Sequence, residues 1–153
     1  GRAPRGSHFL RKSTLWRLLS WARDDLIPDL AVVLVDRDGD ADRREMLHDY
    51  VSDLRQTVPV IAVAREEFEA WLVADESAAG QALGRTFDRT PDPEGLERNQ
   101  AKTTIEQWTS SVPRDERPRV RRDIAALCDL AILRRRCPAF DQLVSELSGI
   151  ELP

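Results

Sequence analysis

The sequence predicts an α/β fold, with a Rossmann-like parallel sheet in the N-terminal half and a helical C-terminal half. Two apolar runs rich in β-branched residues, at 30–35 and 58–64, are typical of strands that are buried on both faces. A helical pattern separates them, and a strand–helix–strand unit of this length has parallel strands. After residue 97 the apolar positions follow the helical period, which predicts helices to the end of the chain.

The first half divides into a loop, two strands and three helices. Ser13 or Thr14 is expected to cap the first helix. Pro59 lies at the start of the second strand, where a strand tolerates proline. The expected elements are a loop at 1–12, a helix with Leu15, Leu18, Leu19 and Ala22 inward, a strand at 30–35, a helix at 42–56, a strand at 58–64, and a helix at 65–75 that opens directly from that strand.

The second half is expected to contain a loop and three helices within the same domain. The loop spans 76–95, and proline residues at 113 and 138 separate the helices. These helices are expected at 97–110, 118–135 and 139–148. We therefore expect one domain over residues 1–153, with an α/β core at 1–76 and a helical extension at 77–153.

Composition narrows the class of protein. The net charge of −4 disfavours a general nucleic-acid coat protein. No segment approaches the roughly 20 apolar residues of a membrane-spanning helix, and no secretory signal pattern opens the chain. Cys128 and Cys137 have no histidine partners at metal-binding spacing, so we expect free thiols and a cytoplasmic location.

Three carboxylates follow the first strand at alternate positions: Asp36, Asp38 and Asp40. Because side chains alternate along a strand, Asp36 and Asp38 are expected on one face. Neighbouring carboxylates repel unless a cation neutralises them, and Mg²⁺ prefers oxygen ligands. The pattern indicates a metal site, and a polar, glycine-containing turn is the alternative.

The second strand also ends in acidic residues, Glu66, Glu67 and Glu69. Parallel strands deliver their carboxyl ends to one edge of a sheet, where ligands gather. The two acidic groups could therefore share one cation. The helix dipole offers another explanation for Glu66 and Glu67, since acids are favoured in the first turn of a helix. Glu69 lies deeper in the expected helix and is explained less well in this way.

These segments resemble a known family. Val33-Leu-Val-Asp36-Arg-Asp38-Gly is similar to the DxD motif of toprim domains, which topoisomerases, primases and several nucleases share. The segment 64–75 resembles the E-x-x-E-A-W signature of a toprim-like prokaryotic family, often encoded beside ABC-type or overcoming-lysogenization-defect-type ATPases in phage-defence loci. The opening stretch 1–12, residues 91–94 with Lys102, and residues 137–140 are similar to the same family, so the resemblance covers nearly the whole chain.

The resemblance implies a Mg²⁺- or Mn²⁺-dependent nuclease that cleaves RNA or DNA as the effector of a prokaryotic antiviral defence system. It implies metal binding by Asp36 and Asp38, a ligand or base role for Glu69, and a position near the scissile phosphate for Lys102. We also expect Asp40 to contribute to the metal site, and Arg5 and Lys12, in the basic opening stretch, to bind phosphate. For Lys102, a solvated helix position is the alternative.

One departure from the family leaves a second function open. Toprim enzymes carry a glutamate at the end of an earlier strand, whereas no acidic residue precedes Asp24 here. We therefore expect that this domain lacks the family's first strand. The alternative function is a catalytically incomplete module that docks on a partner ATPase. For either function, a homo-oligomer is a further expected partner state. A receiver-like phosphotransfer domain is a third reading, which requires a lysine on a later strand that the sequence does not predict.

Overall fold

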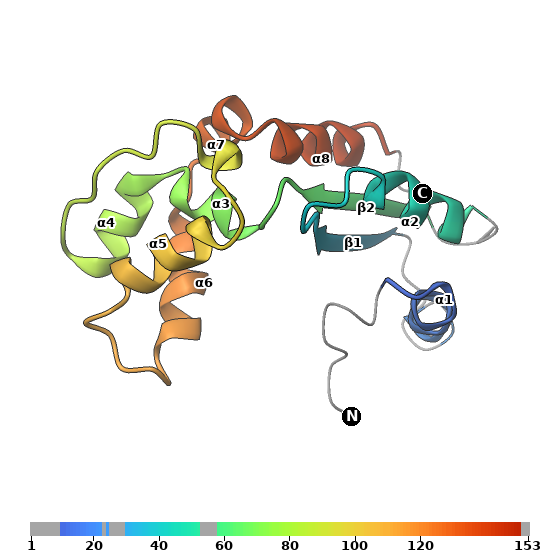
Figure 1. Ribbon diagram of the computed structural model, residues 1–153, viewed down its shortest axis with the longest axis horizontal. Coiled ribbons are helices and arrows are strands. Elements are labelled where there is room, and N and C mark those ends of the chain that lie inside the picture. The colour runs from blue at the N-terminus through green and yellow to red at the C-terminus, as the bar shows by residue number, and fades with distance from the viewer. Residues whose placement is uncertain (1–9, 23, 25–29, 53–57, 151–153) are drawn as a thin grey trace.

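The computed structural model describes residues 10–22, 24, 30–52 and 58–150. Its fold is mixed α/β, as the sequence predicts (Figure 1). In the described part, β1 (Leu30–Asp36) and β2 (Val58–Ala64) form a parallel two-stranded sheet, with Leu30 opposite Val58 and Asp36 opposite Ala64. Both predicted strands and their parallel direction are confirmed.

Helices α1 (Lys12–Trp21) and α2 (Arg43–Val51) form a small core with the sheet. Val33 and Ile61 point into this core, because they share a face of the sheet by register. The Trp16 indole also donates a hydrogen bond to the Tyr50 carbonyl oxygen, at 2.6 Å, which ties α1 to α2. The buried members of this core are Leu15, Val33, Leu47, Val51 and Ile61.

The second half is helical and has a core of its own. It contains α3 (Glu69–Val73), α4 (Glu76–Leu83), the short 3₁₀ turn η3 (Pro93–Gly95), α5 (Gln100–Trp108) and α6 (Arg117–Leu127). In Figure 1 these elements group at the end of the molecule opposite α1 and α2. Their common core consists of Ala70, Leu72, Val73, Ala79, Ala101, Ile105, Trp108 and Ile124.

Two C-terminal helices connect the halves. In Figure 1, α7 (Leu130–Arg136) lies over the helical group and α8 (Pro138–Ser148) runs along β2. Trp71 packs edge-on against Phe140, with ring centroids 5.2 Å apart. A third cluster, Ala64, Trp71, Ala74, Leu133 and Cys137, joins the end of β2 to α3, α7 and α8. The sheet and the helices are therefore packed together across a shared set of buried side chains.

The structure corrects several predicted boundaries. The first helix begins at Lys12, and neither Ser13 nor Thr14 caps it. The predicted helix over 65–75 does not open directly from β2, because Glu66 has a left-handed backbone with φ 57° that a helix excludes. The second helix, α2, ends at Val51, before the predicted residue 56, although residues 53–57 lie outside the described residues.

Two further predictions in the helical half are wrong. Helix α4 lies within the predicted loop 76–95, where Asp75 caps its start and Gly84, in the left-handed conformation with φ 66°, ends it. The predicted helix 118–135 is two helices, because Asp129 begins a new one by accepting a hydrogen bond from the Ala131 N–H. Serine-, aspartate- and glycine-type caps are sequence signals, so both errors were avoidable in principle.

The two cysteine side chains are free, as predicted, and lie near the junction of the halves. Burial raises the pKa of Cys128 to about 11 and that of Cys137 to about 12. A thiol with so high a pKa is protonated at neutral pH and is a poor nucleophile or metal ligand. No helix in the described segments has the length and apolar character that crossing a membrane requires.

Candidate functional site

The ends of β1 and β2 place acidic residues at one edge of the sheet. Asp36 is the last residue of β1, and its Oδ1 accepts a hydrogen bond from the Phe68 N–H at 2.9 Å. The Arg37 N–H donates to the Ala64 carbonyl oxygen at 3.0 Å, so the strand ends stay paired. The turn that follows β2 is thereby held against Asp36, before α3 begins.

Lys102 brings the helical half to this edge. Its Nζ lies 3.6 Å from Asp36 Oδ2 and 3.0 Å from Glu67 Oε1. Its backbone N–H also donates to Glu67 Oε2 at 3.2 Å. Burial alone would lower the pKa of Lys102, but the bond to Glu67 and the charges of Glu69 and Asp36 together raise it. Lys102 is therefore a fully charged ammonium group fixed between carboxylates.

Glu69 is the first residue of α3 and is only 4% exposed. Within the described part of the chain, its Oε2 is buried without a hydrogen-bond partner. Burial is the main cause that raises the pKa of Glu69 above the ordinary 4.5, and Asp36 and Glu67 add to it, while a backbone hydrogen bond and Lys102 oppose it. We call Asp36, Glu67, Glu69 and Lys102 the carboxylate cluster.

Asp38 and Asp40 lie apart from this cluster, in the turn after β1. Asp38 has a left-handed backbone, with φ 51°, so the alternation that would place it beside Asp36 ends there. Its carboxylate lies 3.3 Å from Arg43 and 3.6 Å from Arg98. Asp40 lies 3.6 Å from the Arg43 Nε. Asp38 and Asp40 therefore share Arg43, and of the three aspartates only Asp36 reaches Lys102.

The other predicted site residues are also separated. Glu66 pairs with Arg37 and does not share a helical face with Glu69. Lys12 is exposed at the start of α1. Arg5 lies outside the described residues. The structure thus joins Asp36, Glu69 and Lys102 from the predicted site residues. In the described residues, no three acidic, histidine or cysteine side chains form a group that could hold a metal ion by themselves.

Two buried glutamates, one in the cluster and one outside it, were not among the predicted site residues. Glu67 is 1% exposed and orients Lys102. Glu94 is 2% exposed, and its two oxygens accept hydrogen bonds from the Trp71 indole at 2.8 Å and the Ala139 N–H at 3.0 Å. Glu67 carried a signal, since it stands among the acids after the second strand. Nothing local marks Glu94, because its partners come from α3 and α8.

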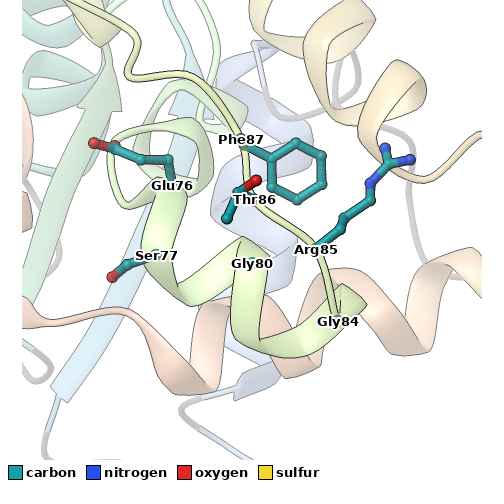
Figure 2. Close-up of a pocket in the computed structure, with 7 residues that line it drawn as sticks. All are labelled: Glu76, Ser77, Gly80, Gly84, Arg85, Thr86 and Phe87. Carbon is teal, nitrogen blue, oxygen red and sulfur yellow. The ribbon is translucent and has the colours of Figure 1, made fainter.

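A hollow of about 560 Å³ lies beside α4, and none of these carboxylates lines it (Figure 2). Its polar side chains do not converge: Figure 2 shows Glu76 and Ser77 pointing away from Phe87. Ser77 donates to Asp75, Glu76 pairs with Arg136, and Arg85 donates to the Trp108 carbonyl oxygen at 2.7 Å. A ligand site needs a few convergent polar groups, so the carboxylate cluster is the better candidate.

Residues 17–148 match the family model described as "Domain of unknown function (DUF4276)". The chain belongs to the DUF4276 family. Comparison with curated proteins and with solved structures found no match. The region shared with DUF4276 contains every residue of the carboxylate cluster and excludes Arg5 and Lys12.

Proposed function

We propose that this DUF4276 protein is a toprim-like, metal-dependent nuclease that hydrolyses phosphodiester bonds in RNA or DNA. The observation that carries the proposal is Glu69: a buried carboxylate with one unpartnered oxygen and a raised pKa, beside Asp36 and Lys102. Buried acids with perturbed pKa values and a specific charged neighbour are typical of catalytic acids and bases. The position agrees with the rule that ligands bind at the carboxyl ends of parallel strands.

The donor atoms fit Mg²⁺ or Mn²⁺ as cofactor. Mg²⁺ is commonly held by one or two carboxylates, with waters and substrate phosphates as its other ligands. Asp36 and Glu69 would supply those two carboxylates, and the unpartnered oxygen of Glu69 is available for such a contact. The absence of a three-carboxylate group in the described residues is compatible with this mode. A bound ion would polarise a phosphoryl oxygen and acidify a water molecule.

The residues of the chain have distinct roles in this proposal. Lys102, held by Glu67, places a positive charge where negative charge develops on the phosphate. Glu69 is either the second metal ligand or the general base, and for the base role its raised pKa brings proton exchange closer to neutral pH. Glu67 is a positioning residue, since both of its oxygens face Lys102.

The biological setting is proposed from the sequence resemblance. The DxD and E-x-x-E-A-W segments support an effector of prokaryotic antiviral defence, located in the cytoplasm and working with an ABC-type ATPase. The proposed nuclease would contain Asp36 and Glu69 from these two segments, together with Lys102.

A cleavage assay with two site variants and one matched control tests the nuclease. Labelled tRNA, single-stranded DNA and duplex DNA are incubated with Mg²⁺ or Mn²⁺. Glu69→Gln and Asp36→Asn are each expected to reduce cleavage at least about 100-fold. The control, Glu106→Gln, removes an exposed carboxylate from α5 and is expected to cleave at the wild-type rate. Cleavage that persists in both site variants would contradict the proposal.

Metal binding is measured separately from activity. Isothermal titration with Mn²⁺ is expected to show binding to the wild type and to Glu106→Gln, and much weaker binding to Asp36→Asn. Equal Mn²⁺ affinity in the wild type and Asp36→Asn would remove Asp36 from the metal site, whatever the cleavage assay shows.

A specific observation favours docking on a partner ATPase as the second candidate function. Val32 and Leu34 of β1 are 47% and 45% exposed, and in the described residues β1 pairs only with β2. An exposed apolar strand edge is a surface that proteins usually cover. Replacing Val32 and Leu34 with threonine is expected to abolish co-purification with the ATPase and leave any cleavage intact, which separates the two functions.

A further inference from the structure

We propose a phosphate-binding subsite beside the ends of β1 and β2, in a hollow whose lining contains no residue of the carboxylate cluster. A hollow of about 270 Å³ there is lined by Arg37, Arg44 and Arg65, together with Gln142 and the first residues of α8. We call it the arginine pocket. The inference rests on the proposed nuclease function and adds where the enzyme holds a phosphate of the nucleic acid that is not being cleaved.

The arginine pocket adjoins the cluster through the backbone of the strand ends. Arg37 directly follows Asp36, and Arg65 follows Ala64, which pairs with Asp36. Both arginines line the pocket, each one position beyond the end of its strand, and consecutive Cα atoms are only about 3.8 Å apart.

Two of the three arginines that line the pocket are already paired with carboxylates. Arg37 pairs with Glu66, and Arg44 pairs with Glu146. Arg65 is exposed and, among the described residues, makes no ion pair or side-chain hydrogen bond. Arg65 therefore has a complete set of free donors, and its guanidinium suits a phosphate group.

The Glu94 carboxylate also lines the pocket. Both oxygens of Glu94 are already occupied, by the Trp71 indole and the Ala139 N–H. The pocket also lies at the N-terminus of α8, an 11-residue helix, whose dipole adds positive potential there. The amide of Gln142 is a further potential donor. Three arginines from separate segments therefore line one hollow, and Arg65 is the one whose donors are free for a phosphate.

Binding measured without cleavage tests the subsite. Fluorescence anisotropy is recorded in EDTA with single-stranded 12-nucleotide RNA and DNA, each carrying either a 5′-phosphate or a 5′-hydroxyl. Arg65→Ala is expected to bind about tenfold more weakly than the wild type, and the slope of log affinity against log salt is expected to fall by about 0.7. Arg65→Lys keeps the positive charge but lacks the forked guanidinium group. Its affinity is expected to lie between those of the wild type and Arg65→Ala.

The matched control is Arg122→Ala, which removes an exposed arginine from α6. It changes the net charge equally and is expected to bind within about twofold of the wild type, because a charge far from the contact is screened beyond a Debye length. Thermal unfolding of each variant verifies that it is folded. If Arg122→Ala and Arg65→Ala weaken binding equally, only net charge matters and the subsite is refuted.

The two oligonucleotide ends identify the source of the phosphate. An Arg65 effect with both ends assigns an internal phosphate to the pocket, and an effect confined to the 5′-phosphate assigns a terminal one; either result supports the subsite. Weaker binding by Arg65→Ala without cleavage of any substrate would support the pocket and contradict the nuclease. If the wild type cleaves nucleic acid and Arg65→Ala binds as tightly as the wild type, the nuclease would be supported and the pocket contradicted.

Discussion

The beginnings of α3 and α4 each bury one acidic residue, and the two acids differ in their surroundings. Asp75, at the start of α4, is 2% exposed, and Glu69, at the start of α3, is 4% exposed. Asp75 accepts hydrogen bonds from Ser77, from the Ala78 N–H and from the Asp129 N–H. One oxygen of Glu69 has no partner in the described part of the chain.

The pKa values move in opposite directions for this reason. Burial alone would raise the pKa of Asp75, but its hydrogen bonds outweigh burial and lower the pKa below the ordinary 3.8. For Glu69 burial prevails and raises the pKa. Equal burial of the same chemical group therefore does not define its role. We infer that Asp75 stabilises the fold, whereas Glu69 is held in an energetically unfavourable state, which agrees with the catalytic role proposed for it.

The largest expected effect on stability is that of Asp75→Ala. The change leaves the buried N–H group of Ala78 and the partly buried N–H group of Asp129 without an acceptor, and we expect the free energy of unfolding to fall by about 2–4 kcal/mol. Urea denaturation at pH 7 measures it. Asp129→Ala is the matched control, because Asp129 is an exposed cap of α7 and its loss is expected to cost about 1 kcal/mol. Equal losses in the two variants would contradict the prediction that Asp75 stabilises the fold more than an ordinary helix cap does.

The pH dependence of Asp75 has a definite sign. Because its folded-state pKa lies below 3.8, the stabilisation is present above pH 3.8 and is lost as the pH falls through the folded-state pKa. Asp75→Asn is expected to lack this part of the acid transition. Denaturation curves between pH 5 and pH 2 compare the two proteins, and an unchanged acid slope in the variant would contradict the assignment.

A smaller loss is expected from Glu67→Gln. The amide still accepts from the Lys102 N–H, but it no longer pairs with the ammonium group 3.0 Å away. Because Lys102 is partly exposed, we expect a loss of only about 1 kcal/mol in urea denaturation. The pKa of Lys102 is expected to fall, since Glu67 contributes to raising it; NMR titration of the ammonium group follows this change.

The smallest change in stability, and one of opposite sign, is expected from Glu69→Gln. The folded state binds the Glu69 proton more tightly than the unfolded state does, so ionised Glu69 destabilises the fold above its raised pKa. Glu69→Gln should therefore be at least as stable as the wild type at pH 7.5, and this advantage should shrink as the pH falls toward 4.5. A clear loss of stability at pH 7.5 would show that the Glu69 carboxylate is structural, like that of Asp75.

Part of this site could be predicted from the sequence. Asp36 stands directly after the first apolar run and Glu69 shortly after the second, and parallel strands bring such positions to one edge. The misplaced residues, Asp38 and Glu66, both have left-handed backbones. The strand and helix periods hold only while the backbone stays in the strand or helix conformation. Beyond a single left-handed residue, the period no longer predicts on which face a side chain lies.

The sequence by itself determined the two strands, their parallel direction and the acids that follow the strands. These features depend on local apolar patterning and on the length of the segment that connects the strands. Tertiary structure alone decided which acid meets which cation. Lys102 reaches Asp36 and Glu67 only because α5 packs against α3 through the buried Ile105 core. Burial then distinguishes Glu69 from Asp75, and burial is a property of the packed chain that no single segment carries.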